Sequence, residues 1–352
     1  MAKTIYDNSQ RYFAATGQVK YKNAYRRRLQ DVTIMGDILN ANPENVKSFL
    51  GSGKGTQVEL YIPGTVKIRE TTIDGGITYQ QMTDTIERFG VSHMAYWALK
   101  FRPEDLSFMP WDPRSEYFTN AAYQMARFIE RKFGDDAPGK VPSYNRGHAA
   151  GIKYGAYDLG DVTDGHAVVL YKTQKQVDDA TGVLRRETAP DFMMRLADTL
   201  REGEGQSGMH VSIIVPGPVK HLLKTSELKY EGLMGRNTLL GSDTRGGRNE
   251  VRFLGTTTDG VTLIEDNIMF RAKPYTANGK VHTVYPVYAL MQDAFAYVDD
   301  TVFRDNEMKD IGNWDVHYRA KQIFDWPMLF PSMSAIGYVE IGTNDYDEPS
   351  AT

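Results

Sequence analysis

The chain has 352 residues, no cysteine and a formal net charge of -4. A chain of this length has room for one large core or two modest ones, and we expect two lobes. The absence of cysteine excludes disulfides and thiolate metal sites, so stability must come from packing or from partner chains. The net charge argues against a chain-wide electrostatic hold on nucleic acid or on an anionic membrane. No apolar stretch of about 20 residues is present, so we expect a soluble protein made in a cytoplasm, without a membrane helix.

Residues 1–48 are polar and weakly periodic, and we predict an extended arm there. Between residues 20 and 28 the arm carries cations with tyrosines interleaved, and the cations are Lys20, Lys22, Arg26, Arg27 and Arg28. Cations beside aromatic side chains suit contact with nucleic-acid phosphates, and a solvated or partner-binding segment explains them equally well. Both interpretations stay open.

Residues 56–101 alternate apolar and polar side chains, which is typical of β-strands. Strands are predicted at three strings, VELYI (58–62), VKIRE (66–70) and HMAYWALKF (93–101). Turn signals at residues 63–64 and 74–76 favour long antiparallel arms folded back on themselves. A lone β-hairpin is marginal in water, so we expect another chain to cover this one.

Residues 51–57, GSGKGTQ, resemble a phosphate-binding loop. Such a loop leaves a buried strand and enters a helix, so that backbone N–H groups point at the phosphates. Here a polar segment precedes the loop, a strand pattern follows it, and Ser48 stands where the phosphate-loop pattern needs its first glycine. We therefore predict a hinge and keep a nucleotide phosphotransferase as the alternative. The hinge residues are Gly51, Gly53, Lys54 and Gly55.

One long helix is predicted over residues 113–133. Asp112 suits its N-cap, Pro113 its first position and Gly134 its end. An apolar stripe is predicted at Tyr117, Ala121, Met125, Phe128 and Ile129. Charged side chains expected to be mostly solvated are Arg114, Glu116, Arg127, Glu130 and Arg131.

After this helix the pattern becomes mixed. A hairpin is predicted between HAVVLYKTQ and GVLRRET, with its turn at residues 178–182. Two helices, at 190–202 and within 217–228, flank a buried strand at 210–216. Further strands are predicted around 250–255, 261–270 and 316–341, with a hairpin turn at Asn278-Gly279.

No catalytic residue, metal site or cofactor is predicted. The chain lacks the usual serine-elbow, zinc-helix and dinucleotide motifs, and its seven histidines never have the i, i+4 spacing of a helical metal pair. Asp158, Asp161 and Asp164 resemble a calcium loop only loosely, because its ligands come at alternate positions. We expect a solvated acidic loop there, and a protein that is not an enzyme.

In their order along the chain, these pieces resemble the major capsid proteins of tailed bacteriophages, which share the Hong Kong 97 or Johnson fold. SGKGTQVELYIPG (52–64) is similar to the start of the extended loop in podovirus-type members, and DPRSEYFTNAAYQMARFIERKF (112–133) is similar to their spine helix. MHVSIIVPGPVKHLLKTSEL (209–228) and RFLGTTTDGVTLIEDNIM (252–269) resemble parts of their axial domain.

The resemblance implies an α+β fold with five segments. They are an N-terminal arm (1–50), an extended β-hairpin loop (51–101), a peripheral domain with the spine helix (102–143), an axial domain (144–295), and peripheral strands with the C-terminal tail (296–352). Residues 144–188 are longer than a minimal axial domain needs, which suggests an inserted hairpin.

The resemblance also implies a function. The chain would assemble into pentamers and hexamers of an icosahedral virion shell around double-stranded DNA, in the host cytoplasm. Implied partners are further copies, a separate scaffolding protein, a portal protein and the packaged DNA, with no membrane. Apolar residues of the hairpin expected to contact a neighbouring chain are Trp97, Leu99 and Phe101. The alternative within this fold is an encapsulin-like compartment that encloses cargo enzymes.

Overall fold

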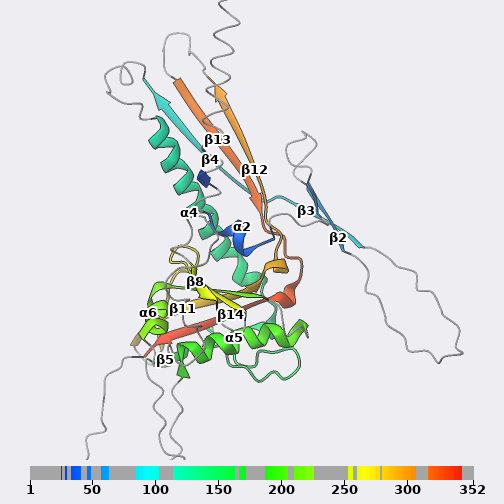
Figure 1. The fold of residues 1–352 in the computed structure, drawn as a ribbon, viewed down its shortest axis with the longest axis vertical. Coiled ribbons are helices and arrows are strands. Elements are labelled where there is room, and N and C mark those ends of the chain that lie inside the picture. The colour runs from blue at the N-terminus through cyan, green and yellow to red at the C-terminus, as the bar shows by residue number, and fades with distance from the viewer. Residues whose placement is uncertain are drawn as a thin grey trace, which may run out of the picture. The chain divides into compact units, whose positions relative to one another are not determined.

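The chain folds into two compact units, and its path passes from the first to the second and back twice. The first unit holds Met1–Asn40, Arg114–Phe295 and Met328–Thr352, and the second holds Ala41–Pro113 and Ala296–Pro327. The computed structural model (Figure 1) describes residues 25, 28–29, 33–40, 46–48, 57–62, 85–102, 114–162, 166–171, 187–204, 210–225, 253–256, 260–277, 280–306 and 316–342. The two compact units correspond to the two predicted lobes. The boundaries of the five predicted segments stay a prediction.

An eight-stranded mixed sheet forms the centre of the first unit, in the order β6-β5-β14-β11-β7-β9-β8, with β10 paired to β11. Its strands are β5 (Val168–Tyr171), β6 (Glu187–Thr188), β7 (Val211–Val215), β8 (Phe253–Thr256), β9 (Val261–Glu265), β10 (Lys273–Ala277), β11 (Lys280–Met291) and β14 (Ser334–Ile341). β7 and β9 are almost continuously apolar because side chains on both of their faces are buried.

Helix α5 (Ala189–Glu204) runs along one face of this sheet and contacts β5, β7, β11, β14 and helix α6 (Gly217–Thr225) (Figure 1). Its start is fixed where Thr188 Oγ1 donates to Asp191 Oδ2 at 2.8 Å. Gly337 of β14 allows the close approach, because a Cβ there would stand 2.5 Å from the Phe192 ring.

The long helix is α4 (Arg114–Lys140). It does not end at Gly134 as predicted. A Cβ at Gly134 would stand 1.6 Å from the Met269 carbonyl oxygen, so this glycine allows close packing within the helix instead of stopping it. The chain continues helically past it to Lys140, with Pro138 inside the last turns.

The predicted apolar stripe of α4 is confirmed at Met125 and Ile129 and wrong at Tyr117 and Phe128. Tyr117 and Phe128 are 48% and 46% exposed, whereas the buried side chains are Phe118, Ala122, Met125, Ala126, Ile129, Phe133 and Ala137. Glu130 was expected to be solvated but is fully buried, and its Oε1 accepts the Ile34 N–H at 3.2 Å. A carboxylate can lie in the buried stripe because it meets this backbone donor.

The N-terminal segment is not extended at the residues described. Tyr25, Arg28 and Leu29 are helical, and Tyr25 and Leu29 are buried. The short helix α2 (Met35–Ile38) follows, and Ile34, Met35, Ile38 and Leu39 are buried as well. This segment therefore belongs to the core of the first unit.

Aromatic rings fill the centre of the first unit. The Phe133 ring stands edge-on to the rings of Tyr288 and Phe295, and Phe270 stacks on Tyr288 with 5.2 Å between ring centroids. Tyr288 is completely buried, and this burial raises the pKa of its hydroxyl above the ordinary range. Short 3-10 helices connect the elements: η1 (Ser143–Asn145), η3 (Gln292–Ala294) and η4 (Pro331–Met333).

The second unit contains two antiparallel three-stranded sheets, β1-β2-β3 and β12-β13-β4. Their strands are β1 (Val46–Ser48), β2 (Gln57–Ile62), β3 (Thr85–Gly90), β4 (His93–Phe101), β12 (Val298–Asn306) and β13 (Val316–Asp325). β2 and β3 pair antiparallel from Gln57 opposite Gly90 to Ile62 opposite Thr85. β2 and β4 match the predicted strands at 58–62 and 93–101, whereas β3 was not predicted. The predicted strand VKIRE and its turns lie outside the described residues.

Local predictions in the remaining sequence are confirmed, but one pairing is wrong. The helices α5 and α6 and the strands β7, β9, β13 and β14 lie where the patterns predict. β10 and β11 pair antiparallel, as the predicted hairpin requires, and its turn residues 278–279 lie outside the described residues. The hairpin predicted across residues 178–182 is not formed by the described strands, because β5 pairs with β6 in parallel and with β14 in parallel. None of the described helices is long and apolar enough to cross a membrane.

Candidate assembly surfaces

Strand β4 has two distinct faces. Its odd-numbered residues are half-buried and its even-numbered residues are exposed, as the alternating sequence requires. Trp97, Leu99 and Phe101 lie on the half-buried face. β4 pairs with β13 and not with β2 or β3, so Leu99 stands opposite Tyr318 and the Phe101 ring meets the Tyr318 ring edge-on at 5.8 Å. Their contact with a neighbouring chain stays a prediction.

The opposite face of β4 is more exposed. Met94 and Tyr96 are 61% and 79% exposed, and Tyr96 lies directly opposite Lys321 of β13. Arg319 is exposed on the same face, opposite Ala98. Sequence reasoning gave this face no role, although the alternation that places Trp97 on one side also places Tyr96 on the other.

Only part of the predicted basic arm is described. Arg28 donates from Nη2 to the Tyr123 hydroxyl of α4, and its guanidinium lies 4.7 Å from the centre of the Tyr123 ring. Arg28 therefore serves contacts within the chain. Lys20, Lys22, Arg26 and Arg27 lie outside the described residues, as do the predicted hinge residues Gly51, Gly53, Lys54 and Gly55.

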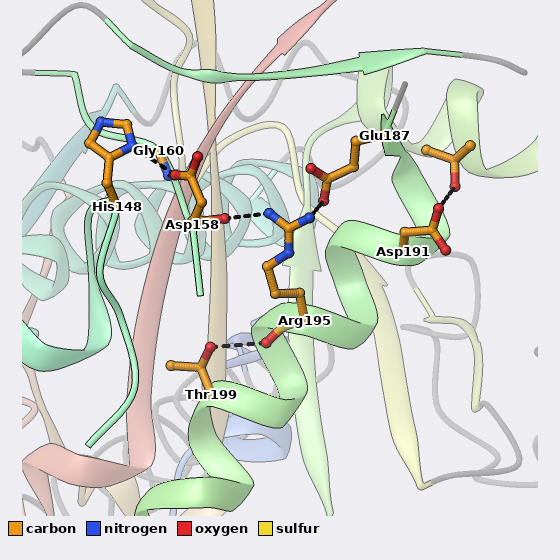
Figure 2. A network of polar contacts seen from close by, with 8 residues as sticks. His148, Asp158, Gly160, Glu187, Asp191, Arg195 and Thr199 are labelled. Atoms are coloured by element: carbon orange, nitrogen blue, oxygen red, sulfur yellow. Dashed lines mark hydrogen bonds and ion pairs between the residues drawn. The ribbon is translucent and has the colours of Figure 1, made fainter. Parts of the chain in front are cut away.

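Segment 147–160, which follows η1, is held against α5 by polar contacts (Figure 2). Arg195 Nη1 donates to the Asp158 carbonyl oxygen at 2.7 Å, and the other Arg195 nitrogen lies 2.5 Å from Glu187 Oε1. The Asp158 side chain accepts the Gly160 N–H at 2.9 Å and lies 2.7 Å from His148 Nδ1. One arginine thus ties the C-terminal part of the segment to both α5 and β6.

A second residue of α5 holds the middle of the same segment. Glu202 Oε1 accepts the backbone N–H groups of Lys153 and Tyr154, the latter at 2.5 Å. Glu202 comes seven residues after Arg195, and residues two helical turns apart lie on one face of a helix. The polar face of α5 therefore holds segment 147–160 at two places.

Glu187 has two opposing influences on its charge. Burial raises the pKa of its carboxyl, and the charge and hydrogen bond of Arg195 lower it. Asp191 and Asp158 raise the pKa further, so the net direction is upward.

A metal site finds no geometric support among the described residues. No group of three or more His, Asp and Glu side chains is placed there to hold a metal ion. Asp158 is used in the polar contacts above, the Asp161 backbone N–H donates to the His166 carbonyl, and Asp164 lies outside the described residues. The described part of the predicted acidic loop is therefore built around backbone contacts.

The contacts of Arg195 and Glu202 were missed by sequence reasoning. Their spacing on a helix is visible in the sequence, but their partners are main-chain atoms about 40 to 50 positions earlier in the chain. A side-chain pattern carries no signal for such partners.

Comparison with solved structures gives matches along most of the chain. The capsid of Ralstonia phage GP4 matches with a TM-score of 0.56 at 12% identity, over 87% of this chain and 91% of that chain. The capsid of the cyanophage P-SCSP1u matches with a TM-score of 0.50 at 11% identity, over 88% of each chain. A virus-like particle from Pyrococcus furiosus covers 90% of this chain at a TM-score of 0.45, which is too low to support a conclusion.

Comparison by sequence gives no match, either to a protein-family model or to a curated protein. At identities near one residue in eight, likeness to solved structures establishes a shared fold and nothing about activity.

Proposed function

Because this chain has the fold of phage capsid proteins, we propose that it is the major capsid protein of a tailed bacteriophage, a structural subunit without an active site. The observation that carries this proposal is the fold likeness to the Ralstonia phage GP4 capsid over most of both chains. The mixed composition of the described elements, one long helix with several sheets, is consistent with it.

In finer terms, the proposal assigns the Hong Kong 97 arrangement to the chain. Helix α4 is then the spine helix, and β2 and β3 form the base of the extended loop. Seven strands of the eight-stranded sheet lie in the axial domain, and its strand β14 comes from the segment 296–352. Residues 1–50 act as the N-terminal arm, and the peripheral domain comprises residues 102–143 and 296–352.

The physics of the second unit favours assembly with other copies. Each of its two sheets has only three described strands, so a large share of their strands lies at sheet edges. Edge strands with free backbone groups are places where another chain adds contacts. Head-to-tail contacts of this kind close into rings, and pentamers and hexamers of one chain build an icosahedral shell.

The proposed partners follow from that role. The shell encloses double-stranded DNA in the virion and is assembled in the host cytoplasm with a separate scaffolding protein and a portal protein. Trp97, Leu99 and Phe101 contribute to contacts between copies, and Lys54 forms an exposed interchain ion pair worth about 0.2 to 1 kcal/mol per copy.

Purification of the chain expressed in bacterial cells tests the proposal. We expect sedimentation velocity to show rings or closed shells in equilibrium with subunits, and electron microscopy to show regular particles. A strictly monomeric species at every concentration, also with a crowding agent, would contradict the proposal. Particles that retain a cargo enzyme and exclude DNA would favour the encapsulin-like alternative.

A further inference from the structure

The tip of segment 147–160 exposes apolar side chains on the first unit. Tyr154 is 76% exposed and Ile152 is 44% exposed, with exposed Lys153 between them. Exposed loop tips with small and polar residues are common and tolerate change. Two large apolar side chains within three residues of such a tip call for a separate explanation.

The backbone under these side chains is fixed. Glu202 accepts the N–H groups of Lys153 and Tyr154, and Gly155 donates its N–H to the Gly151 carbonyl at 3.1 Å. At the base of the tip, Ala150 and Tyr157 exchange two backbone hydrogen bonds of 2.8 and 2.9 Å. The conformational entropy of this tip is thus already lost in the isolated subunit.

Two glycines make this shape available. Gly151 and Gly155 have φ angles of 112° and 57°, in the region that favours glycine. A Cβ at Gly151 would also stand 2.6 Å from Glu202 Oε2 and 2.9 Å from the Tyr157 ring. The Glu202 side chain, the two glycines and the backbone hydrogen bonds together hold Ile152 and Tyr154 outward in one conformation.

We propose that Ile152, Lys153 and Tyr154 form a preformed contact knob that packs against a second copy of this chain. Tyrosine is enriched among the residues that dominate binding energy at interfaces, and a fixed loop binds without a further ordering cost. This inference rests on the proposed shell function.

The small size of the knob favours a second copy over a separate binary partner. A tyrosine buries about 150 to 250 Å² when it is covered, whereas a specific two-protein interface needs about 1,000 Å² or more. A single knob therefore cannot hold a partner alone. It suits an assembly in which every copy makes the same small contact and several others.

The test replaces both apolar side chains, Ile152→Ser with Tyr154→Ser, and keeps every backbone hydrogen bond of the tip. We expect the critical concentration for assembly, measured by light scattering, to rise about tenfold or more, which is the effect of losing one dominant interface residue. The matched control is Val281→Ser, a 74% exposed apolar residue of the same unit outside this segment. It should assemble like the wild type, and all three proteins should unfold at the same denaturant concentration.

A second variant tests the fixed conformation. Glu202→Ala leaves Ile152 and Tyr154 in place but removes the acceptor for two backbone N–H groups, and we expect weaker assembly with faster proteolysis within residues 147–160. A photo-reactive phenylalanine analogue in place of Tyr154 should cross-link two copies of this chain in assembled particles. A cross-link to a different protein would overturn the choice of partner.

The outcomes separate the two proposals. If the wild type never assembles, the proposed shell function is wrong, and the proposed role of the knob, which depends on it, is wrong as well. If the wild type assembles and the double variant assembles equally well, the shell function stands and the knob is wrong.

Discussion

Glu130 shows how one residue joins two distant segments of the first unit. Its side chain is fully buried on α4, and its carboxylate accepts the Ile34 N–H just before α2. Replacement Glu130→Ala leaves that donor without its acceptor and opens a cavity, so we expect a loss of about 1 to 3 kcal/mol in the free energy of unfolding. Denaturant titration of the unassembled subunit measures it.

Two further variants make this prediction specific to the buried contact. Glu130→Gln keeps an acceptor oxygen and should cost less than alanine. Asp135→Ala removes an exposed carboxylate from the same helix and should change stability by no more than about 0.5 kcal/mol. Equal effects of Glu130→Ala and Asp135→Ala would show that the buried contact with Ile34 contributes nothing.

Glu187 gives the subunit a pH dependence of defined sign. Burial raises the pKa of this carboxyl in the folded state, with Arg195 only partly opposing the change. A raised pKa means that the folded state binds the proton more tightly, so this contribution to stability is present below the unfolded pKa of about 4.3 and is lost as the pH rises through the folded pKa. Relative to Glu187→Gln, the wild type should therefore lose stability as the pH rises above the unfolded pKa of about 4.3.

Comparing the two proteins removes the effect of all other carboxyl groups. If attraction to Arg195 dominated, the wild type would instead gain stability over the variant as the pH rises. Denaturant midpoints at several pH values distinguish the two signs.

At the scale of elements, two glycines of α4 make a matched pair. Gly134 has no room for a Cβ beside the Met269 carbonyl, whereas a Cβ at Gly139 would meet nothing within 4 Å. We expect Gly134→Ala to destabilise the subunit by about 1 to 3 kcal/mol through overpacking. Gly139→Ala should be neutral or stabilising by up to about 1 kcal/mol, because alanine favours the helix.

Thermal unfolding of the two variants measures the difference. A Gly134→Ala protein as stable as the wild type would mean that α4 and the Met269 backbone are not packed this closely. Loss of stability in both variants would indicate a general intolerance of this helix to alanine.

The existence of most described elements could be predicted from sequence, whereas their orientation and pairing could not. On α4, Tyr117 and Phe128 have the spacing of a helical stripe just as Phe118 and Ile129 do, so periodicity leaves two neighbouring faces open. The small residues Ala122, Ala126 and Gly134 mark the buried face, since they allow close packing there. The charged Glu130 makes that face look solvated in the sequence, because the sequence does not reveal its partner, the Ile34 N–H.

Strand pairing is set by contacts between residues far apart in sequence. β4 pairs with β13 more than two hundred positions later, and β5 pairs in parallel with β14. A local turn signal at residues 178–182 favoured an antiparallel hairpin, but the central sheet determines the direction of β5 and β6. For the same reason, the contacts of Arg195 and Glu202 with segment 147–160 could be recognised only from the structure.

At the scale of the whole molecule, the basic arm tests the proposed role in assembly. Deleting residues 1–28 would not isolate this role, because Tyr25 is buried and Arg28 contacts Tyr123, and their loss would also damage folding. Substituting glutamine at Lys20, Lys22, Arg26 and Arg27 removes the charges and keeps both contacts. We expect an unchanged unfolding midpoint and a lower yield of shells.

The matched control replaces Lys132, which lies outside the arm, with glutamine. An arm variant that forms shells of normal size and yield would show that these four cations have no role between chains or toward DNA. A changed unfolding midpoint would show instead that they act within the subunit.

The central claim is that copies of this chain build a closed shell, and cryo-electron microscopy of the expressed and purified protein tests it most directly. We predict icosahedral particles whose asymmetric unit is filled by this fold, with α4 and the eight-stranded sheet recognisable in each copy. Uniform monomers, or particles in which this chain does not form the shell, would contradict the account.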